Sequence, residues 1–289
     1  MLKLYYNLFR IPQWIKNFFI FVPLIFSKHL FTADYVKLSL LGFVIFSLVS
    51  SSIYIINDLL DIDSDRIHPK KKFRPIPANL ISSKSAILIS IILAAASFSL
   101  LPFTNLYFGI IVFAYFLITI LYSVGLKNIV IIDVFTIAAG FILRILGGAF
   151  IINVEISSWL MLTTMFISLF LAVMKRRSEL KQIFNQDVSN TRQVLVHYSS
   201  EFIDQMSTVT SAGVIICYAF YTVSQRTVMV FNTESLIYTT PFVVFGIFRY
   251  MYLVYIGKKG ESTSEILLSD LPMIFNIVVY LITVILIIY

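Results

Sequence analysis

Charged residues are scarce in this chain. Asp, Glu, Lys and Arg make up 13% of its 289 residues, whereas a soluble domain carries about a quarter. Hydrophobic residues make up 59%, and the mean hydropathy is +0.91. These values exclude an ordinary soluble domain and predict an integral membrane protein.

Cysteine is nearly absent as well. The single Cys217 lies inside an apolar run, so it argues for neither a disulfide nor a thiolate metal site. The chain does carry an excess of positive charge, with a net charge of +7. In a chain this apolar, positive loops encode membrane orientation more often than binding to nucleic acid. We therefore expect no nucleic-acid partner.

The apolar residues fall in blocks long enough to cross a bilayer, without the alternating pattern of a membrane β-barrel. Backbone groups in hydrocarbon must bond internally, so the blocks are predicted to be helices. The expected fold class is all-α, a single integral-membrane domain over residues 1–289 with nine transmembrane helices. The predicted spans are 12–31, 38–56, 85–101, 106–124, 129–152, 156–174, 206–223, 236–256 and 271–289.

Basic residues divide unevenly between the loops. With the N-terminus inside, seventeen Lys or Arg lie on the cytoplasmic side and three lie outside, namely Lys28, Lys37 and Arg226. Cytoplasmic loops carry the Lys and Arg excess. We therefore expect a multi-pass protein of the inner or plasma membrane, with the N-terminus and every candidate polar site facing the cytoplasm.

Four carboxylates lie within eight residues where the second span meets water: Asp58, Asp61, Asp63 and Asp65. If the helix continues past the membrane, Asn57 and all of these except Asp63 share one face. Like charges on one face destabilise a helix unless a cation bridges them. Hard oxygen ligands select magnesium, manganese or calcium. The alternative is a solvated acidic turn.

A basic run follows, with Lys70, Lys71, Lys72 and Arg74. Such a run is ordinarily a membrane-surface anchor. However, the prolines of Arg74-Pro75-Ile76-Pro77 stiffen the backbone around one Arg, which suits a fixed anion site. Acidic residues for a cation and basic residues for an anion, together at a membrane surface, indicate metal-assisted chemistry on a phosphate ester with a lipid partner.

Arg144 lies well inside the fifth span, roughly 20 Å along the helix at the α-helical rise. Charges at such depth are costly and by default functional, although an Arg that pairs structurally with a neighbouring helix is the alternative. Glycines at 140, 147 and 148 permit close helix approach. Further candidates lie near the cytoplasmic ends of predicted spans: Lys16, Tyr54, Tyr122, Lys127, Asp133, Lys175 and Arg176.

The run from Asn57 to Asp65 has the form N-D-x-x-D-x-x-x-D and precedes Pro69, Lys70, Arg74 and Pro75. It resembles the UbiA superfamily of intramembrane prenyltransferases. The resemblance implies a bundle of nine spans with a cytoplasm-facing polar cavity, in which this motif holds magnesium and a substrate diphosphate. Typical members carry a second Asp-rich motif after the sixth span. Here that place reads Lys-Arg-Arg-Ser-Glu over 175–179, which is basic.

The chain as a whole resembles the decaprenyl-phosphate phosphoribosyltransferase branch of that superfamily. The resemblance rests on residues 13–17, 57–77, 122–127, 140–144 and 175–176. It implies magnesium-dependent transfer of 5-phosphoribose from phosphoribosyl diphosphate to a polyprenyl phosphate, releasing pyrophosphate, for cell-envelope polysaccharide precursors. The missing second acidic motif favours this branch, because a lipid phosphate needs a cationic cradle at headgroup depth.

The resemblance also implies roles for the candidates. Asn57, Asp58, Asp61 and Asp65 hold magnesium, and the three carboxylates are expected to be catalytic. The donor's phosphates fall to Lys70, Lys71, Arg74, Lys127 and Arg144, with Tyr54 near the ribose and Lys16 as a further phosphate candidate. Lys175 and Arg176 are expected to position the acceptor phosphate. Tyr122 and Asp133 are expected to contact substrate.

Two other functions stay open at this point. One is an ordinary prenyltransferase that moves an isoprenyl group from its diphosphate to an aromatic or quinone acceptor, using the same metal motif. The other is a transporter, which fits the hydropathy and the buried Arg144 but not the adjoining acidic and basic runs. The oligomeric state also stays open, with a homo-oligomer among the options.

Overall fold

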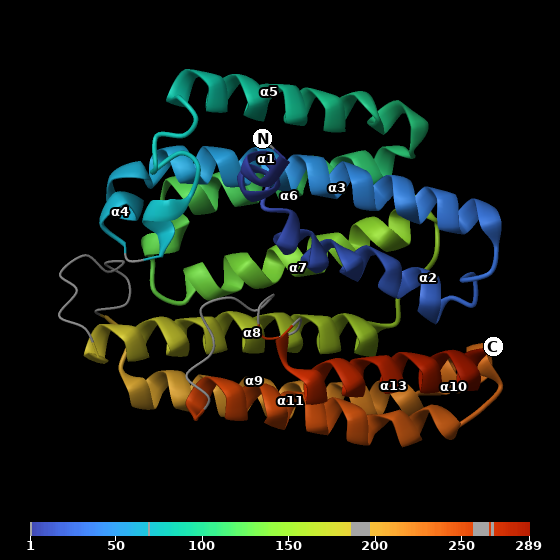
Figure 1. Cartoon of the computed structure of the whole chain (residues 1–289). Helices are drawn as coiled ribbons and strands as arrows, with labels where there is room; N and C mark the ends of the chain where they lie inside the picture. Colours follow the sequence, from blue (N-terminus) through green and yellow to red (C-terminus); the bar gives the residue numbers. More distant parts are fainter. Residues whose placement is uncertain (1, 69, 186–196, 257–265, 267–268) are drawn as a thin grey trace.

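The computed structural model describes residues 2–68, 70–185, 197–256, 266 and 269–289, and every regular element in these ranges is helical (Figure 1). The elements are α1 (Leu2–Leu8), η1 (Ile11–Phe21), α2 (Val22–Phe26), α3 (Ala33–Leu60), α4 (Ile62–Ile67), η2 (Lys71–Phe73), α5 (Ser83–Ser99), η3 (Leu101–Phe103), α6 (Leu106–Val124), η4 (Leu126–Asn128), α7 (Ile132–Ile151), α8 (Ser158–Asn185), α9 (Ser200–Val223), α10 (Gln225–Phe231), η6 (Ser235–Thr239), α11 (Thr240–Tyr255) and α13 (Leu271–Ile288).

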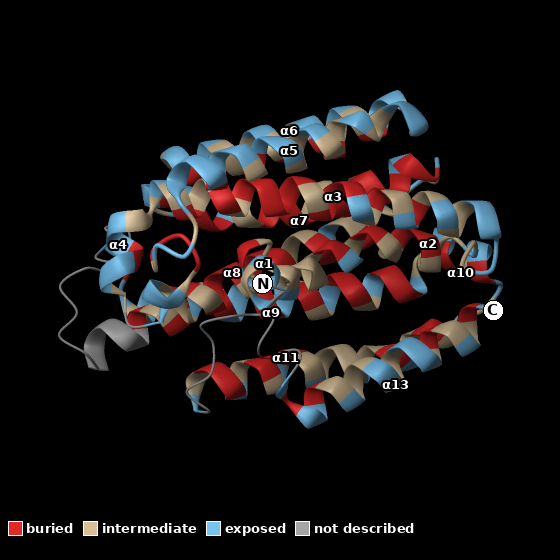
Figure 2. Cartoon of the chain, turned by 45° about the horizontal axis from the view of Figure 1, so that its top comes forward, coloured by how far each residue is buried: buried red, intermediate tan, exposed pale blue. Residues whose placement is uncertain are grey.

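Eight helical stretches in the described ranges are long and apolar enough to cross a membrane. They correspond to the last eight predicted spans, so the all-α, multi-pass membrane fold is confirmed. They pack side by side, and α7 contacts η1, α2, α3, α6 and α8 (Figure 1). In Figure 2, α3 and α7 are largely buried, whereas α5 and α6 turn many exposed residues outward. Exposed apolar side chains on outer helices are expected where lipid surrounds the bundle.

The first predicted span differs from the others, because it is not a regular α-helix. Residues 11–21 form the 3₁₀ helix η1, and α2 continues it for five residues. A 3₁₀ helix rises about 2.0 Å per residue, so these sixteen residues still reach roughly 30 Å, the thickness of the hydrocarbon core. With three residues per turn, Trp14, Asn17 and Ile20 lie on one face of η1. Trp14 and Asn17 donate to serines of α3, and Ile20 is buried.

Gly148 brings α7 against η1. A Cβ atom at this position would lie 2.1 Å from the Ile20 carbonyl oxygen, so only glycine fits there. Close approach at this glycine therefore holds η1 against the most buried helices and fixes the position of the residues that η1 presents to the interior.

The helix that carries the acidic motif continues past the predicted end of its span at residue 56 and bends within the motif. α3 stops at Leu60, Asp61 has φ −99° and ψ 12°, and α4 begins at Ile62. The Asp61 carboxylate contacts the side chains of Asn57 and Lys127, and α4 begins at this bend. The break is slight, because the Asp65 N–H still donates to the Asp61 carbonyl at 2.8 Å. The carboxylates on either side of the bend therefore keep nearly helical spacing.

Candidate active site

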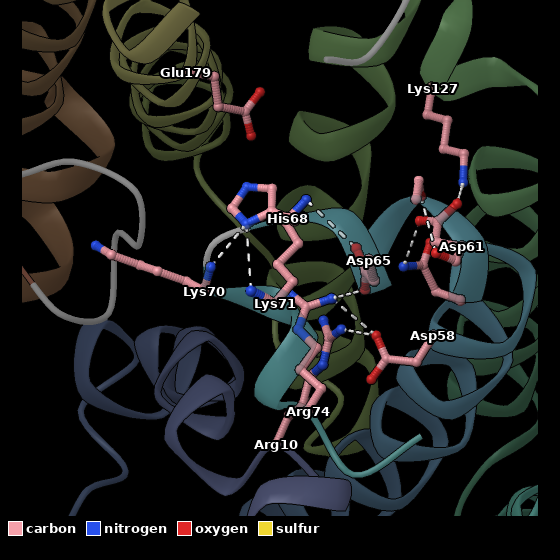
Figure 3. A network of polar contacts seen from close by, with 12 residues as sticks. Arg10, Asp58, Asp61, Asp65, His68, Lys70, Lys71, Arg74, Lys127 and Glu179 are labelled. Atoms are coloured by element: carbon pink, nitrogen blue, oxygen red, sulfur yellow. Dashed lines mark hydrogen bonds and ion pairs between the residues drawn. The ribbon is translucent and has the colours of Figure 1, made fainter. Parts of the chain in front are cut away.

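The acidic motif forms an ion-pair cluster with cations from three other parts of the chain (Figure 3). Asp58 is 2% exposed. Its carboxylate accepts from the Arg10 guanidinium and, at 3.0 Å, from Arg74. The same Arg74 nitrogen reaches Asp65 at 2.5 Å, and Lys71 lies 3.8 Å from the other Asp65 oxygen. Two buried carboxylates thus share one guanidinium.

Asp61 lies beside this pair and has its own partners. Its carboxylate accepts from Lys127 Nζ at 2.5 Å and from the Asn57 amide at 3.2 Å. Asp63 has a side chain that is 91% exposed, and it pairs with Arg66 at 3.7 Å. The structure therefore gathers Asn57, Asp58, Asp61 and Asp65, and leaves Asp63 in solvent as the helical spacing predicts.

Local backbone structure brings the cations to the acids. Arg10 adopts φ 50° and ψ 46° between α1 and η1, a left-handed conformation that is uncommon for a residue other than glycine. Arg74 follows η2 and precedes Pro75, in the segment that its two prolines are expected to stiffen. Burial and the nearby Arg10 lower the pKa of Arg74, while Asp58 and Asp65 oppose the shift. A guanidinium stays charged at physiological pH, so the cluster is a network of full charges.

A cavity of about 160 Å³ lies next to the acid cluster. Its lining includes the cations Arg10, Lys16, Arg144 and Lys175, and among the residues described there it includes no carboxylate. Hydroxyl groups and one amide complete the polar lining: Ser50, Tyr54, Asn57, Tyr115, Thr119, Tyr122, Ser123 and Thr136. Such a lining favours an anion with several hydroxyl groups over a cation.

Arg144 is 4% exposed and lies deep in this cavity wall. Its three guanidinium nitrogens donate at 2.7 Å to the Asn17 side chain, the Gly140 carbonyl and the Tyr115 hydroxyl. All three acceptors are neutral, and Arg144 forms no ion pair within the described ranges. Lys16 likewise forms no hydrogen bond or ion pair with a described residue. A buried charge without a counter-ion is costly, so Arg144, together with the half-buried Lys16, predisposes the cavity to an anionic ligand.

Comparison with known proteins identifies the relatives of this chain. The sequence profile of the UbiA prenyltransferase family matches residues 18–277. This chain belongs to the UbiA prenyltransferase family. It is similar to the decaprenyl-phosphate phosphoribosyltransferase of Mycolicibacterium smegmatis, with 30% identity over 90% of this chain and 85% of the relative. The protein of the same name from Corynebacterium glutamicum is 29% identical over 90% of this chain and 79% of the relative.

A solved UbiA structure shares the fold. The UbiA homologue from Archaeoglobus fulgidus, in a structure described as bound to DMAPP and Mg²⁺, superposes with a TM-score of 0.74 and covers 99% of both chains. The sequence identity is 18%, so this likeness concerns the fold. The prediction of a UbiA-like bundle is confirmed.

Arg176, which was predicted to position the acceptor phosphate, lies in a different environment from the residues of the cavity. Arg176 is fully buried, and its guanidinium donates to Asp133 at 2.5 Å, to Glu179 and to the Tyr122 hydroxyl at 3.1 Å. Arg176 is not among the residues that line the cavity. All three nitrogens of this fully buried guanidinium are already engaged, and none of them faces the cavity where a substrate phosphate would bind. The structure therefore places Arg176 and Asp133 behind the cavity wall.

The other predicted residues fall into two neighbouring groups, with one exception. The acid cluster contains Asn57, Asp58, Asp61, Asp65, Lys71, Arg74 and Lys127, and the cavity lining contains Lys16, Tyr54, Tyr122, Arg144 and Lys175. Asn57 lies in both, which places the groups side by side. Lys70 is the exception. It is exposed, its N–H donates to His68 Nδ1 at 3.2 Å, and its side chain points away from the carboxylates (Figure 3).

Sequence reasoning missed several residues of this UbiA site. Arg10 resembles any basic residue before a first span, and Tyr115 and Tyr198 carry no local signal. Asn17 lies in the 13–17 run that carries the resemblance, but its contact with Arg144 was not predicted. Arg10 is 48 residues from the carboxylate that it contacts. Such contacts arise from packing between distant segments, which a single sequence does not display.

The donor atoms of the acid cluster fit a hard divalent cation. Carboxylate and amide oxygens are the ligands that magnesium accepts, usually one or two from the protein with water and phosphate completing the shell. No group of three or more His, Cys, Asp or Glu in the described part of the chain is already arranged as a metal site. In this structure Asp58, Asp61 and Asp65 each pair with a basic side chain.

Proposed function

We propose that this protein transfers 5-phosphoribose from phosphoribosyl diphosphate to a polyprenyl phosphate of the decaprenyl type and releases pyrophosphate, with magnesium as cofactor. The observation that carries the proposal is the cavity lined by four cations and no described carboxylate, directly beside an acidic motif. Lys175 belongs to this lining and stands where typical family members carry a second acidic motif. The names of the two curated relatives support the same activity.

The acid cluster serves the donor. Asp58, Asp61 and Asp65, with the Asn57 amide, would hold magnesium, which neutralises the departing pyrophosphate when bound. Arg74, Lys71 and Lys127 then exchange a carboxylate for a phosphate oxygen of the donor. These cations already lie within 4 Å of the carboxylates, so the exchange needs only side-chain movement. Lys70 contributes the charge of its side chain to this segment rather than a direct contact with the donor.

The cavity serves the phosphoribosyl group and the acceptor. Arg144 and Lys16 hold phosphate oxygens of the donor, while Tyr54 and the neighbouring hydroxyls bind its ribose. Lys175 receives the acceptor phosphate, which is already an anion at neutral pH and needs no general base. Because Arg176 is taken up by Asp133 and Glu179, its role is to position Lys175 and Tyr122.

The distribution of basic loops supports the orientation. The acid cluster and Lys127 lie where the described basic segment with Lys71 and Arg74 joins α3 to α5. We infer that this end of the bundle faces the cytoplasm of a plasma membrane, where a water-soluble phosphoribosyl donor is available. Residues 1–289 act as one domain in this proposal.

The proposed reaction is tested directly with labelled donor. Purified protein in lipid, with magnesium and phosphoribosyl diphosphate labelled in the ribose, is expected to yield a labelled lipid only when polyprenyl phosphate is added. No labelled lipid would contradict the proposal. Prenylation of 4-hydroxybenzoate from an isoprenyl diphosphate, under the same conditions, would establish the aromatic prenyltransferase instead. Magnesium-independent uptake of substrate into sealed vesicles would indicate a transporter.

Because Arg74 pairs with two carboxylates, its replacement should change the affinities for Mn²⁺ and for pyrophosphate in opposite directions. Arg74→Gln removes a cation that competes with a metal for Asp58 and Asp65, and it also removes a phosphate ligand. We expect the variant to bind Mn²⁺ alone several-fold more tightly and to bind pyrophosphate in the presence of Mn²⁺ about tenfold more weakly, the effect of one charge-assisted contact. Titration calorimetry measures both affinities.

Arg66→Gln is the matched control for this experiment. Arg66 lies in the same segment, donates to Asn79 at 2.8 Å and pairs with the exposed Asp63. We expect both affinities to stay within twofold of the wild type. A change of the same sign in both affinities for Arg74→Gln would contradict the proposed exchange of partners.

A further inference from the structure

The Tyr198 hydroxyl joins two segments behind the cavity. It accepts a hydrogen bond from the Ile131 N–H at 2.7 Å and donates one to the Asp133 carboxylate at 2.8 Å. Tyr198 is 5% exposed and lies just before Ser199, the N-cap of α9. A single buried phenol therefore connects the start of α9 with the turn that precedes α7.

The turn that Tyr198 holds has an unusual backbone. Ile131 has φ 70° and ψ −46°, and across it the Ile132 N–H donates to the Val130 carbonyl at 2.8 Å. These values describe a γ-turn of the rare positive-φ type. A β-branched residue in this conformation is strained and persists only where surrounding contacts impose it. The bond from the Ile131 N–H to Tyr198 is such a contact.

Two cations of the proposed site are connected to this turn. Lys127, four residues before Ile131, reaches Asp61 at 2.5 Å. Asp133, two residues after it, holds Arg176, and Arg176 is the neighbour of Lys175 on α8 and donates to Tyr122. The turn thus connects the acid cluster with the cationic wall of the cavity. Neither Tyr198 nor Asp133 lines that cavity.

We propose that Tyr198 is a positioning residue whose hydroxyl fixes the strained turn at Ile131, and thereby sets the positions of Lys127 and Lys175 for the two substrates. The inference rests on the proposed function for its substrates. The hydroxyl acts as a donor to Asp133 and must stay protonated. Burial, together with the Asp133 carboxylate, raises the pKa of Tyr198 to about 12, so the phenol keeps its proton throughout the physiological range.

Tyr198→Phe tests this role, with Tyr255→Phe as the matched control. The Tyr255 hydroxyl also donates to a carboxylate at 2.8 Å, that of Asp204 on α9, at the same end of the bundle. Tyr198→Phe removes both hydrogen bonds of this hydroxyl. We expect it to raise the KM for both substrates roughly fivefold, the scale of one net hydrogen bond, because the two lost bonds act on the substrates only through the turn. Pyrophosphate binding in the presence of Mn²⁺ should weaken by a similar factor. Tyr255→Phe is expected to leave all three values within twofold.

A second substitution separates positioning from general stability. Glycine adopts positive φ without strain, so adding Ile131→Gly to Tyr198→Phe should restore most of the pyrophosphate affinity. Unchanged affinities in Tyr198→Phe, or no restoration by Ile131→Gly, would overturn the proposal. Pyrophosphate binding is measured without acceptor or turnover. Failure of the wild type to transfer phosphoribose would therefore count against the proposed function and leave this readout intact.

Discussion

Replacement of Asp61 by alanine is expected to lower kcat/KM for phosphoribosyl transfer by about a thousandfold or more, the scale of lost transition-state charge stabilisation. Asp61 lies at the bend between α3 and α4, and its two oxygens contact Lys127 and Asn57. The substitution removes a proposed metal ligand and also the carboxylate that contacts Lys127. Initial rates with labelled donor give the loss of transfer, and titration with Mn²⁺ and pyrophosphate gives the loss of binding.

Asp63→Ala is the control, because Asp63 lies in the same acidic run with a side chain that is 91% exposed. Its removal takes the same charge from the loop without touching the cluster, so activity should stay within twofold. Equal losses in the two variants would show that loop charge, rather than placement, matters. Retention of more than a tenth of the activity in Asp61→Ala would contradict a metal-binding role. Thermal unfolding of both variants checks that each remains folded.

Most of the fold could be predicted, because unbonded backbone groups are costly in lipid and each apolar run must therefore form a helix. The eight regular spans follow from that cost alone. The 3₁₀ geometry of the first span was not predicted, because it depends on contacts with α3 and α7. Trp14 and Asn17 meet serines of α3 at a three-residue period, and Gly148 admits the Ile20 carbonyl. Nothing local to residues 11–26 shows those partners.

The acidic side of the site could be predicted because helical spacing alone brings Asp58, Asp61 and Asp65 together and turns Asp63 away. The cations that face them come from distant segments. Arg10 reaches Asp58 only because the chain turns through a left-handed residue before η1. Tyr198 meets Ile131 across 67 residues. Spacing rules describe one helix at a time, so they find neither contact.

The basic run that begins at Lys175 shows the same limit at closer range. Successive residues of an α-helix point about 100° apart. Lys175 accordingly lines the cavity, Arg176 turns to Asp133, and Arg177 pairs with Asp204 at 2.7 Å. The composition of the run indicates an anion site. Only the packing of α8 against α7 and α9 shows which of the three cations can bind the anion.

Replacement of Lys175 by alanine should therefore raise the KM for polyprenyl phosphate about a hundredfold and change the KM for phosphoribosyl diphosphate less than threefold. The expected loss is that of a charge-assisted contact to phosphate in a site shielded from water.

Arg177→Ala is the matched control. It removes the same charge two residues away, from a side chain that pairs with Asp204 outside the cavity, and both KM values should stay within threefold. Steady-state rates at varied lipid and donor concentrations separate the two constants. A donor KM that rises as much as the acceptor KM would place Lys175 on the donor and contradict the assignment of the cationic wall to the lipid phosphate. Equal acceptor effects in the two variants would reduce the run to an electrostatic anchor, because surface charge attracts an anionic lipid without regard to which residue carries it.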